Sequence, residues 1–137
     1  MKPKAKLTGQ AGEYLVCSEI SALYYDCIPV NETCTYDIIL DYGKLAKIQV
    51  KTSNYSPDAN KERIKFSTSR RNSSNKLYKK RDTDIFALVW LDGKKVAWFA
   101  FEDCNGWKKT IKKEEFDKYT LEGVITKITK LDKARKK

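Results

Sequence analysis

The sequence contains no histidine, and this absence narrows the chemistry open to the protein. Ser-His-Asp and Cys-His enzymes need a histidine base, and many zinc hydrolases and nucleases use histidine as a ligand or base. These classes are therefore excluded. Any catalysis by this chain must use carboxylates, lysine, tyrosine or a metal ion held by oxygen ligands.

Long hydrophobic runs are also absent. Ile85–Leu91, among the longest, is far shorter than the roughly 20 residues that cross a bilayer as a helix. The N-terminal sequence MKPKAKLTGQ lacks the apolar stretch of a secretory signal. We therefore expect a cytoplasmic, intracellular protein that is not secreted and enters no membrane. A length of 137 residues with 41% hydrophobic residues predicts one globular domain over residues 1–137.

Cysteine is scarce, and the four cysteines form no C-x-x-C pair. Without histidine a mixed zinc site is excluded, although a site made of all four thiolates stays open. Cysteines scattered along apolar segments are typical of small buried side chains. We therefore expect buried thiols, and no disulfide in a reducing compartment. The four residues are Cys17, Cys27, Cys34 and Cys104.

Positive charge is concentrated in one segment. The net charge is +10, and residues 61–81 hold nine basic residues against one acidic residue. Such a cluster favours a polyanion as the binding partner. A membrane surface would favour an amphipathic helix with a wide apolar face, and the sequence shows none. Hydroxyl and amide side chains between Ser67 and Tyr78 can also bind phosphate oxygens. We expect DNA contacts from six residues, the arginines being the expected base readers: Arg70, Arg71, Lys76, Lys79, Lys80 and Arg81.

Hydrophobic periodicity predicts an α/β protein with a mixed central sheet flanked by helices. A helix is expected over about residues 8–25, with Gly12, Leu15, Val16, Ile20 and Leu23 on its apolar face. Two hairpins are expected, one across DYGK and one across DGKK. Their strands are Tyr36–Asp41 with Leu45–Thr52, and Ile85–Leu91 with Val96–Phe101. The other predicted elements are strands at Cys27–Asn31, Ile64–Thr68 and VITKITKL (residues 124–131), a short helix near Asn75–Arg81 and a helical turn in KKEEFDKY.

Four polar residues are predicted to converge at one edge of the sheet. Gln49 and Lys51 alternate on one strand and so share a face, and Asp37 lies about opposite on the preceding strand of the hairpin. Glu13 lies near the beginning of the predicted helix, which would pack across the same sheet. An acid, an amide, an amine and a second acid would then meet.

This set of side chains fits metal-assisted phosphodiester hydrolysis. Mg²⁺ prefers hard oxygen ligands, here the Asp37 carboxylate, the Gln49 side-chain oxygen and the Val50 carbonyl, with Glu13 near a second ion or its waters. Lys51 would position or deprotonate the attacking water, or stabilise charge on the phosphate. Any half-exposed strand shows the same alternation of polar and apolar residues. The residues alone therefore leave open whether these side chains are catalytic or only structural.

Three motifs carry a resemblance to a known family. G-x-x-G-E at Gly9–Glu13, Y-D-I-I-L at Tyr36–Leu40 and I-Q-V-K-T at Ile48–Thr52 together resemble the PD-(D/E)XK nuclease superfamily. The Q-x-K variant is similar to the branch of homing endonucleases associated with group I introns. The later segment DTDIFALVWLDGKKVAWFAFED also looks like a strand pair of that branch.

The resemblance implies a restriction-endonuclease-like fold and a DNA endonuclease that uses Mg²⁺, or Mn²⁺ in its place. Glu13, Asp37, Gln49 and Lys51 match the family's active-site positions. Two positions depart from the pattern. Tyr36 stands where the family name has proline, and Gln49 replaces an acid, which removes one negative charge from the metal site.

Cleavage of both strands of a duplex needs two active sites, so we expect a homo-oligomer, either a homodimer or a homotetramer. Three functions remain open. The first is a sequence-specific homing endonuclease, and the second is a Holliday junction resolvase of the same superfamily, acting on branched DNA. The third is a DNA-binding module that keeps the nuclease fold without cleaving.

Overall fold

A computed structural model describes residues 4–31, 34–53, 62–68, 78–104, 106 and 108–135. Two α-helices, seven strands and two 3₁₀ helices are found in these parts of the chain. In chain order they are α1 (Lys4–Ala22), β1 (Asp26–Pro29), β2 (Ile38–Asp41), β3 (Leu45–Ser53), β4 (Arg63–Ser67), β5 (Ile85–Trp90), β6 (Lys95–Ala100), η1 (Phe101–Asp103), β7 (Lys108–Lys112), η2 (Lys113–Lys118) and α2 (Leu121–Arg135).

The central feature is a mixed five-stranded sheet in the order β1-β2-β3-β5-β6. Neighbouring strands are antiparallel except β3 and β5, which run parallel with Ile48 opposite Ile85. β4 and β7 form a separate antiparallel pair. The predicted fold class, a mixed sheet flanked by helices, is confirmed.

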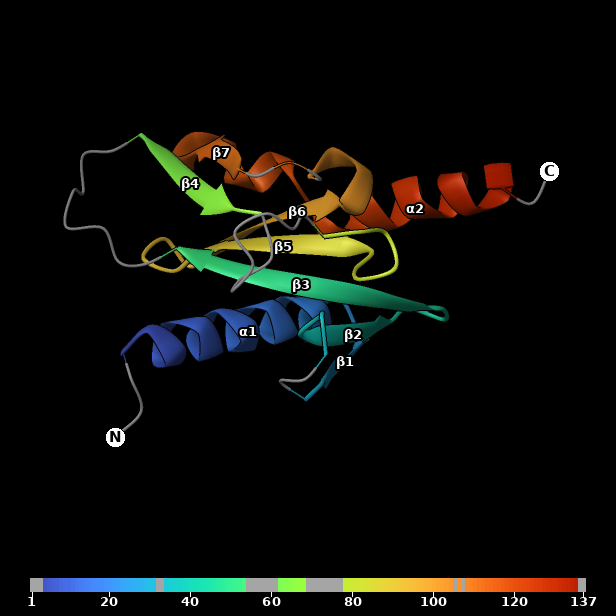
Figure 1. Cartoon of the computed structure of the whole chain (residues 1–137), viewed down its shortest axis with the longest axis horizontal. Coiled ribbons are helices and arrows are strands. Elements are labelled where there is room, and N and C mark those ends of the chain that lie inside the picture. Colours follow the sequence, from blue (N-terminus) through green and yellow to red (C-terminus); the bar gives the residue numbers. More distant parts are fainter. Residues whose placement is uncertain are drawn as a thin grey trace.

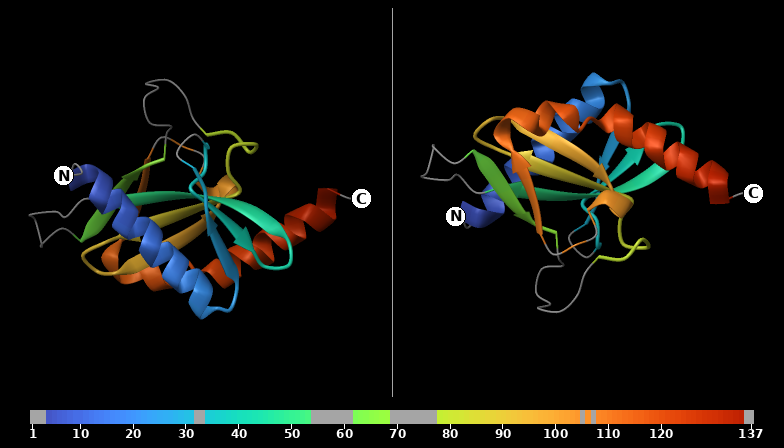
Figure 2. Two further views of the ribbon diagram at one scale, coloured as in Figure 1. Left: turned by 90° about the horizontal axis from the view of Figure 1, so that it is seen from below. Right: turned by 90° about the horizontal axis from the view of Figure 1, so that it is seen from above.

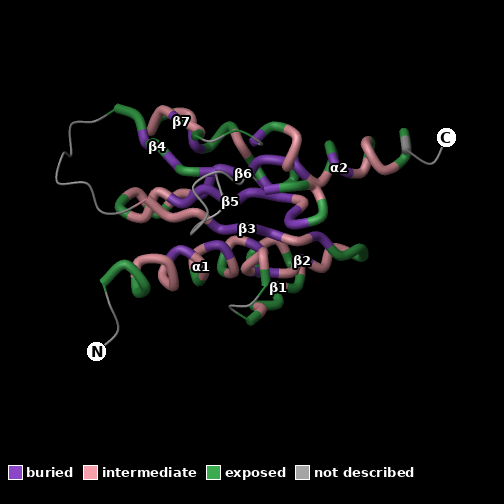
Figure 3. The backbone as a smooth tube through the Cα atoms, viewed as in Figure 1, coloured by how far each residue is buried: buried purple, intermediate pink, exposed green. Residues whose placement is uncertain are grey.

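The sheet has a hydrophobic core on each face, as the burial of its central strands shows (Figure 3). α1 covers one face, and the pair β4–β7 lies on the other side of the sheet (Figure 1). α1 crosses the strands obliquely (Figure 2). α2 runs beside β6 and contributes Leu121, Val124 and Ile128 to the core that α1 covers. No helix in the described part of the chain is long and apolar enough to cross a membrane.

α1 follows the predicted apolar face but begins earlier than predicted. Gly12, Val16 and Ile20 are buried, because residues four apart lie on one side of a helix. Thr8, where the helix was expected to begin, donates its hydroxyl to the Lys4 carbonyl within the first turn. The helix ends at Ala22, two residues before Tyr24, whose φ of 63° places it in the left-handed conformation.

The prediction of a strand at residues 124–131 is wrong, because this segment lies inside α2. β-branched valine, isoleucine and threonine favoured a strand. The spacing of the buried residues Leu121, Val124 and Ile128 is helical, however, and packing against the core decides the structure. The Thr120 hydroxyl also accepts a hydrogen bond from the Gly123 N–H at 3.1 Å, which caps the first turn.

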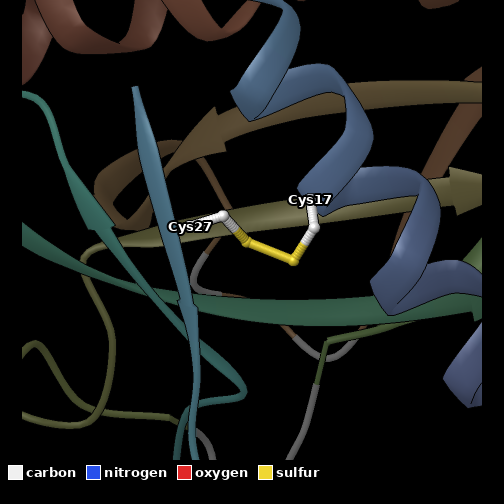
Figure 4. Close-up of a disulfide and its surroundings, with 2 residues drawn as sticks. All are labelled: Cys17 and Cys27. Atoms are coloured by element: carbon white, nitrogen blue, oxygen red, sulfur yellow. A yellow bond between two sulfur atoms is a disulfide. The ribbon is translucent and has the colours of Figure 1, made fainter. Parts of the chain in front are cut away.

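The expectation of four unpaired thiols is also wrong. Cys17 on α1 and Cys27 on β1 form a disulfide, with their Cα atoms 5.5 Å apart (Figure 4). Packing of α1 beside β1 brings the two residues together, which spacing along the chain did not indicate. Cys104 is a buried free thiol as expected, and burial raises its pKa to about 12. Cys34 is free and exposed.

Two further elements differ from the prediction. Of the short helix expected near Asn75–Arg81, the described residues form a turn, in which the Asp82 N–H donates to the Lys79 carbonyl at 2.8 Å. The rest of that segment lies outside the described residues. β7 was not predicted at all, because four of its five residues are polar and its period-2 signal rests on Ile111 alone. The remaining predicted strands appear with shifted ends.

Candidate active site

The candidate site lies where β3 extends beyond β2. β5 accompanies β3 up to Ser53, whereas the described β2 pairs with it only up to Ile48. Asp37 lies directly before β2 and takes the place of a further β2 residue beside β3. Its N–H donates to the Ile48 carbonyl at 2.8 Å, and its Oδ2 accepts the Val50 N–H at 2.8 Å. A carboxylate thus replaces the backbone acceptor that another strand residue would supply.

Gln49 holds the same carboxylate from its side chain. Its Nε2 donates to Asp37 Oδ2 over 2.9 Å, and only 8% of the residue is exposed. A buried amide needs such a partner, because an unpaired polar group away from water is costly. Asp37 Oδ2 therefore accepts two hydrogen bonds, one from a side chain and one from the backbone.

Lys51 lies two residues farther along and on the same face of β3 as Gln49. Its Nζ donates to the Tyr78 hydroxyl at 3.1 Å and lies 5.0 Å from the centre of the Tyr78 ring. Its positive charge also acts on Asp37, where it lowers the carboxyl pKa. Lys51 is thus held by one aromatic residue and faces one carboxylate.

Glu13 reaches the site from α1. Its side chain hydrogen-bonds to Asp37. The preceding residue is Gly12, and a Cβ atom there would lie 1.9 Å from Thr52 Oγ1 on β3. Only glycine permits this approach of α1 to β3, and Glu13 is placed at the edge of the strand as a result.

Burial dominates the electrostatics of Asp37. Loss of hydration raises its pKa above the ordinary 3.8, more than the Val50 hydrogen bond, the Lys51 charge and the Glu13 hydrogen bond together lower it. An acid with a raised pKa among specific charged partners is a candidate for function. The folded chain holds a carboxylate here at a cost to its own stability.

The oxygen atoms at this edge fit a divalent cation of the Mg²⁺ type. The N–H and C=O of a strand residue point to the same side, so the Val50 carbonyl faces the Asp37 side of β3. With the carboxyl groups of Asp37 and Glu13 it supplies hard oxygen donors. Among the described residues no three acidic, histidine or cysteine side chains are grouped so that they could hold a metal ion by themselves, so further ligands here would be neutral groups such as the Val50 carbonyl. Gln49 would have to turn its amide, because Nε2 now faces Asp37.

The predicted DNA-binding residues fall into two groups. Arg70, Arg71 and Lys76 lie outside the described residues. Lys79 and Arg81 are exposed, whereas Lys80 forms an ion pair with Asp84 at 2.6 Å. Phosphate binding by Lys80 would have to compete with that carboxylate.

Sequence reasoning missed the place of Tyr78 in the site. Tyr78 and Thr68 were grouped with side chains that bind phosphate, but both are buried. Thr68 donates to the Gly106 carbonyl, and Tyr78 holds Lys51. No local signal pointed to the second pair, because 27 residues separate its members.

Comparisons with known proteins identify the family and the fold. A family model described as PD-(D/E)XK endonuclease matches residues 3–126. Among solved structures, the bacterial homing endonuclease I-Ssp6803I is similar with a TM-score of 0.64 and 20% identity, over 82% of this chain and 78% of that one. A comparison with curated protein sequences finds no match. The resemblance found in the sequence motifs is confirmed.

Proposed function

Because the chain belongs to the PD-(D/E)XK endonuclease family, we propose that it is a metal-dependent DNA endonuclease that cleaves duplex DNA at a specific sequence. The convergence of Glu13, Asp37, Gln49 and Lys51 beside Val50 carries this proposal. The similarity in fold to a protein described as a homing endonuclease supports sequence-specific cleavage over the other activities considered. We further propose that residues 1–137 act as one nuclease domain.

Each residue has a role in the proposal. Asp37, Glu13, Gln49 and the Val50 carbonyl would hold Mg²⁺ or Mn²⁺. The ion would supply positive charge and Lewis acidity at the scissile phosphate. The Lys51 ammonium group would stabilise negative charge as it develops on the phosphate and orient the attacking water. Tyr78 keeps that ammonium group in place through its hydroxyl and its ring.

The test is cleavage of long DNA of diverse sequence with and without Mg²⁺, with Lys51→Ala beside the unchanged protein. We expect discrete products that require the metal and disappear in Lys51→Ala, with a rate loss of roughly 100-fold or more, as for loss of a charge-stabilising group. Lys47→Ala is the matched control. It lies on the same face of β3, but its Nζ donates to the Arg81 carbonyl and has no role in the proposed mechanism. Cleavage by Lys51→Ala at the unchanged rate would remove Lys51 from the mechanism.

The other proposed activities predict different results in the same assay. A junction resolvase would cut a four-way junction and leave the linear duplex intact. A non-catalytic module would bind DNA with a steep dependence on salt but give no product with Mg²⁺ or Mn²⁺. Paired cuts in the two strands require two copies of the site. Light scattering is expected to show a dimer or tetramer, and a monomer at all concentrations would contradict coordinated cleavage.

A further inference from the structure

The pair β4–β7 has two chemically opposite faces. Residues alternate along each strand, and Ile64, Phe66 and Ile111 point inward and are buried in the core below. Lys109, opposite Phe66, also points inward, with its Nζ 4.6 Å from the centre of the Phe99 ring. The outward positions are polar or charged, and no acidic residue is among them. They are Arg63, Lys65, Ser67, Lys108, Thr110 and Lys112.

The arrangement of these cations works against the stability of the strand pair. Arg63 lies directly opposite Lys112 in the register. Like charges facing each other across two strands are destabilising. Within the described residues, none of the four outward cations forms an ion pair, although Glu62 directly precedes β4. Such an uncompensated surface fits a ligand with many negative charges.

The pair β4–β7, called the basic ribbon below, packs on the face of the sheet that carries Gln49 and Lys51, whereas Glu13 reaches the site from α1 on the other face. Gln49 and Lys51 share a face of the sheet with Phe86 and Leu88, their partners in the parallel register. Phe86 and Leu88 belong to the core on which Ile64 and Phe66 pack, and Tyr78, which holds Lys51, belongs to it as well. A molecule bound to the outward face of the ribbon would therefore extend toward Lys51.

The dimensions of the ribbon suit the major groove of DNA. That groove is roughly 12 Å wide and accepts a two-stranded β-ribbon. Five residues per strand give a length of about 17 Å, and the two strands lie about 5 Å apart before side chains are added. Arginine and lysine are the side chains that most often bind the guanine edge in that groove, and serine and threonine can bind any base.

We propose that the outward face of β4–β7 enters the major groove of duplex DNA and positions it over the candidate active site. The proposal rests on the proposed function and adds a contact surface to it. The ribbon lies outside the segment from Arg70 to Arg81 in which sequence reasoning placed the DNA contacts. Lysines at either side would bind phosphates, and Arg63 would reach base edges.

The test compares two proteins with equal loss of charge. One carries Lys65→Gln, Lys108→Gln and Lys112→Gln. The control carries Lys44→Gln, Lys130→Gln and Lys133→Gln, three exposed lysines in the β2–β3 turn and on α2. Binding to a 5′-labelled duplex of about 30 base pairs is measured without metal across a range of salt concentrations. Circular dichroism and thermal melting verify that both variants fold.

We expect the ribbon variant to flatten the salt dependence by two to three units of slope, at roughly 0.9 for each phosphate that is no longer neutralised, and the control by less than one. A second duplex of the same sequence carries glucosylated hydroxymethyl groups on its cytosines, which fill the major groove. The unchanged protein should bind this duplex at least about tenfold more weakly than plain DNA. The ribbon variant should show a smaller difference between the two duplexes, because its ribbon is held less tightly in the groove.

Each other result overturns the inference. Equal effects of the two triple variants would show that the ribbon faces away from DNA. A flatter slope with no sensitivity to glucosylation would place the ribbon on the phosphate backbone, outside the groove. Binding by the unchanged protein with normal metal-dependent cleavage would leave the proposed function standing in either case. If the unchanged protein bound no DNA at all, the proposed function would fail as well.

Discussion

The two halves of β3 differ in what lies beside them. Residues 45–48 pair with β2 in a regular antiparallel register, and β5 joins β3 on its other side only from Ile48 onward. From Gln49 onward the β2 side is open within the described strands, and the Asp37 carboxylate accepts the Val50 N–H in place of a backbone carbonyl. Polar groups can therefore gather at the edge of a sheet where a side chain, and not a neighbouring strand, accepts the backbone hydrogen bond. The first half stabilises the fold, and the second half offers oxygen atoms.

The largest effect in this comparison is expected from Asp37→Asn. The amide oxygen can still accept both hydrogen bonds, but the negative charge is lost. We expect cleavage to fall below detection, because the carboxylate is the principal ligand of the proposed metal site. The measurement is single-turnover cleavage at saturating Mg²⁺. Asp41→Asn, at the far end of the strand that follows Asp37, is a control that should keep its activity.

The same substitution should stabilise the folded protein at neutral pH. The Asp37 pKa is raised on folding, mainly by burial, so the folded chain binds the proton more tightly than the unfolded chain. The resulting loss of stability grows as pH rises from the ordinary 3.8 through the folded pKa and is complete above it. Asp37→Asn removes this penalty. Its melting temperature should exceed that of the unchanged protein at pH 7, with the difference shrinking toward acid pH; a lower value at pH 7 would contradict the burial argument.

A second, smaller effect is expected from Gln49→Glu, which restores the acid of the family pattern. Without metal, a carboxylate would stand about 3 Å from Asp37 Oδ2 in place of a donor at 2.9 Å, and the melting temperature should fall. With metal the added charge should tighten binding. Each tenfold gain in affinity adds about 1.4 kcal/mol of stabilisation at saturating metal.

Thermal melting with and without Mg²⁺ measures both sides of this prediction. Gln49→Leu is the matched control, because it removes the amide donor without adding charge. It should melt lower without metal and show no larger shift with Mg²⁺. An equal metal-induced shift in Gln49→Glu and the unchanged protein would show that residue 49 is not a ligand.

Local pattern was sufficient to predict the parts of the fold on which the candidate site is built. Alternation in β3 placed Gln49 and Lys51 on one face, and the hairpin placed Asp37 beside them. Spacing in α1 identified the buried Gly12 and so the position of Glu13. All of these residues are within about 40 positions of one another, and strand or helix periodicity relates them. Their catalytic roles stay predictions.

Contacts between distant segments could not be predicted in this way. Val124 and Ile128 belong to a helix because the sheet beside them buries one face, which β-branched composition does not reveal. Lys51 meets Tyr78 because Tyr78 packs in the core between the sheet and the β4–β7 pair. The Cys17–Cys27 disulfide follows from the placement of α1 beside β1. In each case tertiary packing decided between local alternatives.

The smallest effect is expected from a change in the contact between Tyr78 and Lys51. Tyr78→Phe keeps the ring, its packing on Phe86 at 5.4 Å and its position under Lys51, but removes the hydroxyl that accepts the hydrogen bond from Lys51 Nζ. We expect kcat to fall about tenfold (about 1.4 kcal/mol), with KM for DNA and the melting temperature nearly unchanged. Tyr42→Phe, which removes one hydroxyl outside the candidate site, is the control. A rise in KM at constant kcat would mean that Tyr78 contributes to DNA binding. Lys51, in the half of β3 that β2 does not cover, would then not depend on Tyr78 for its position.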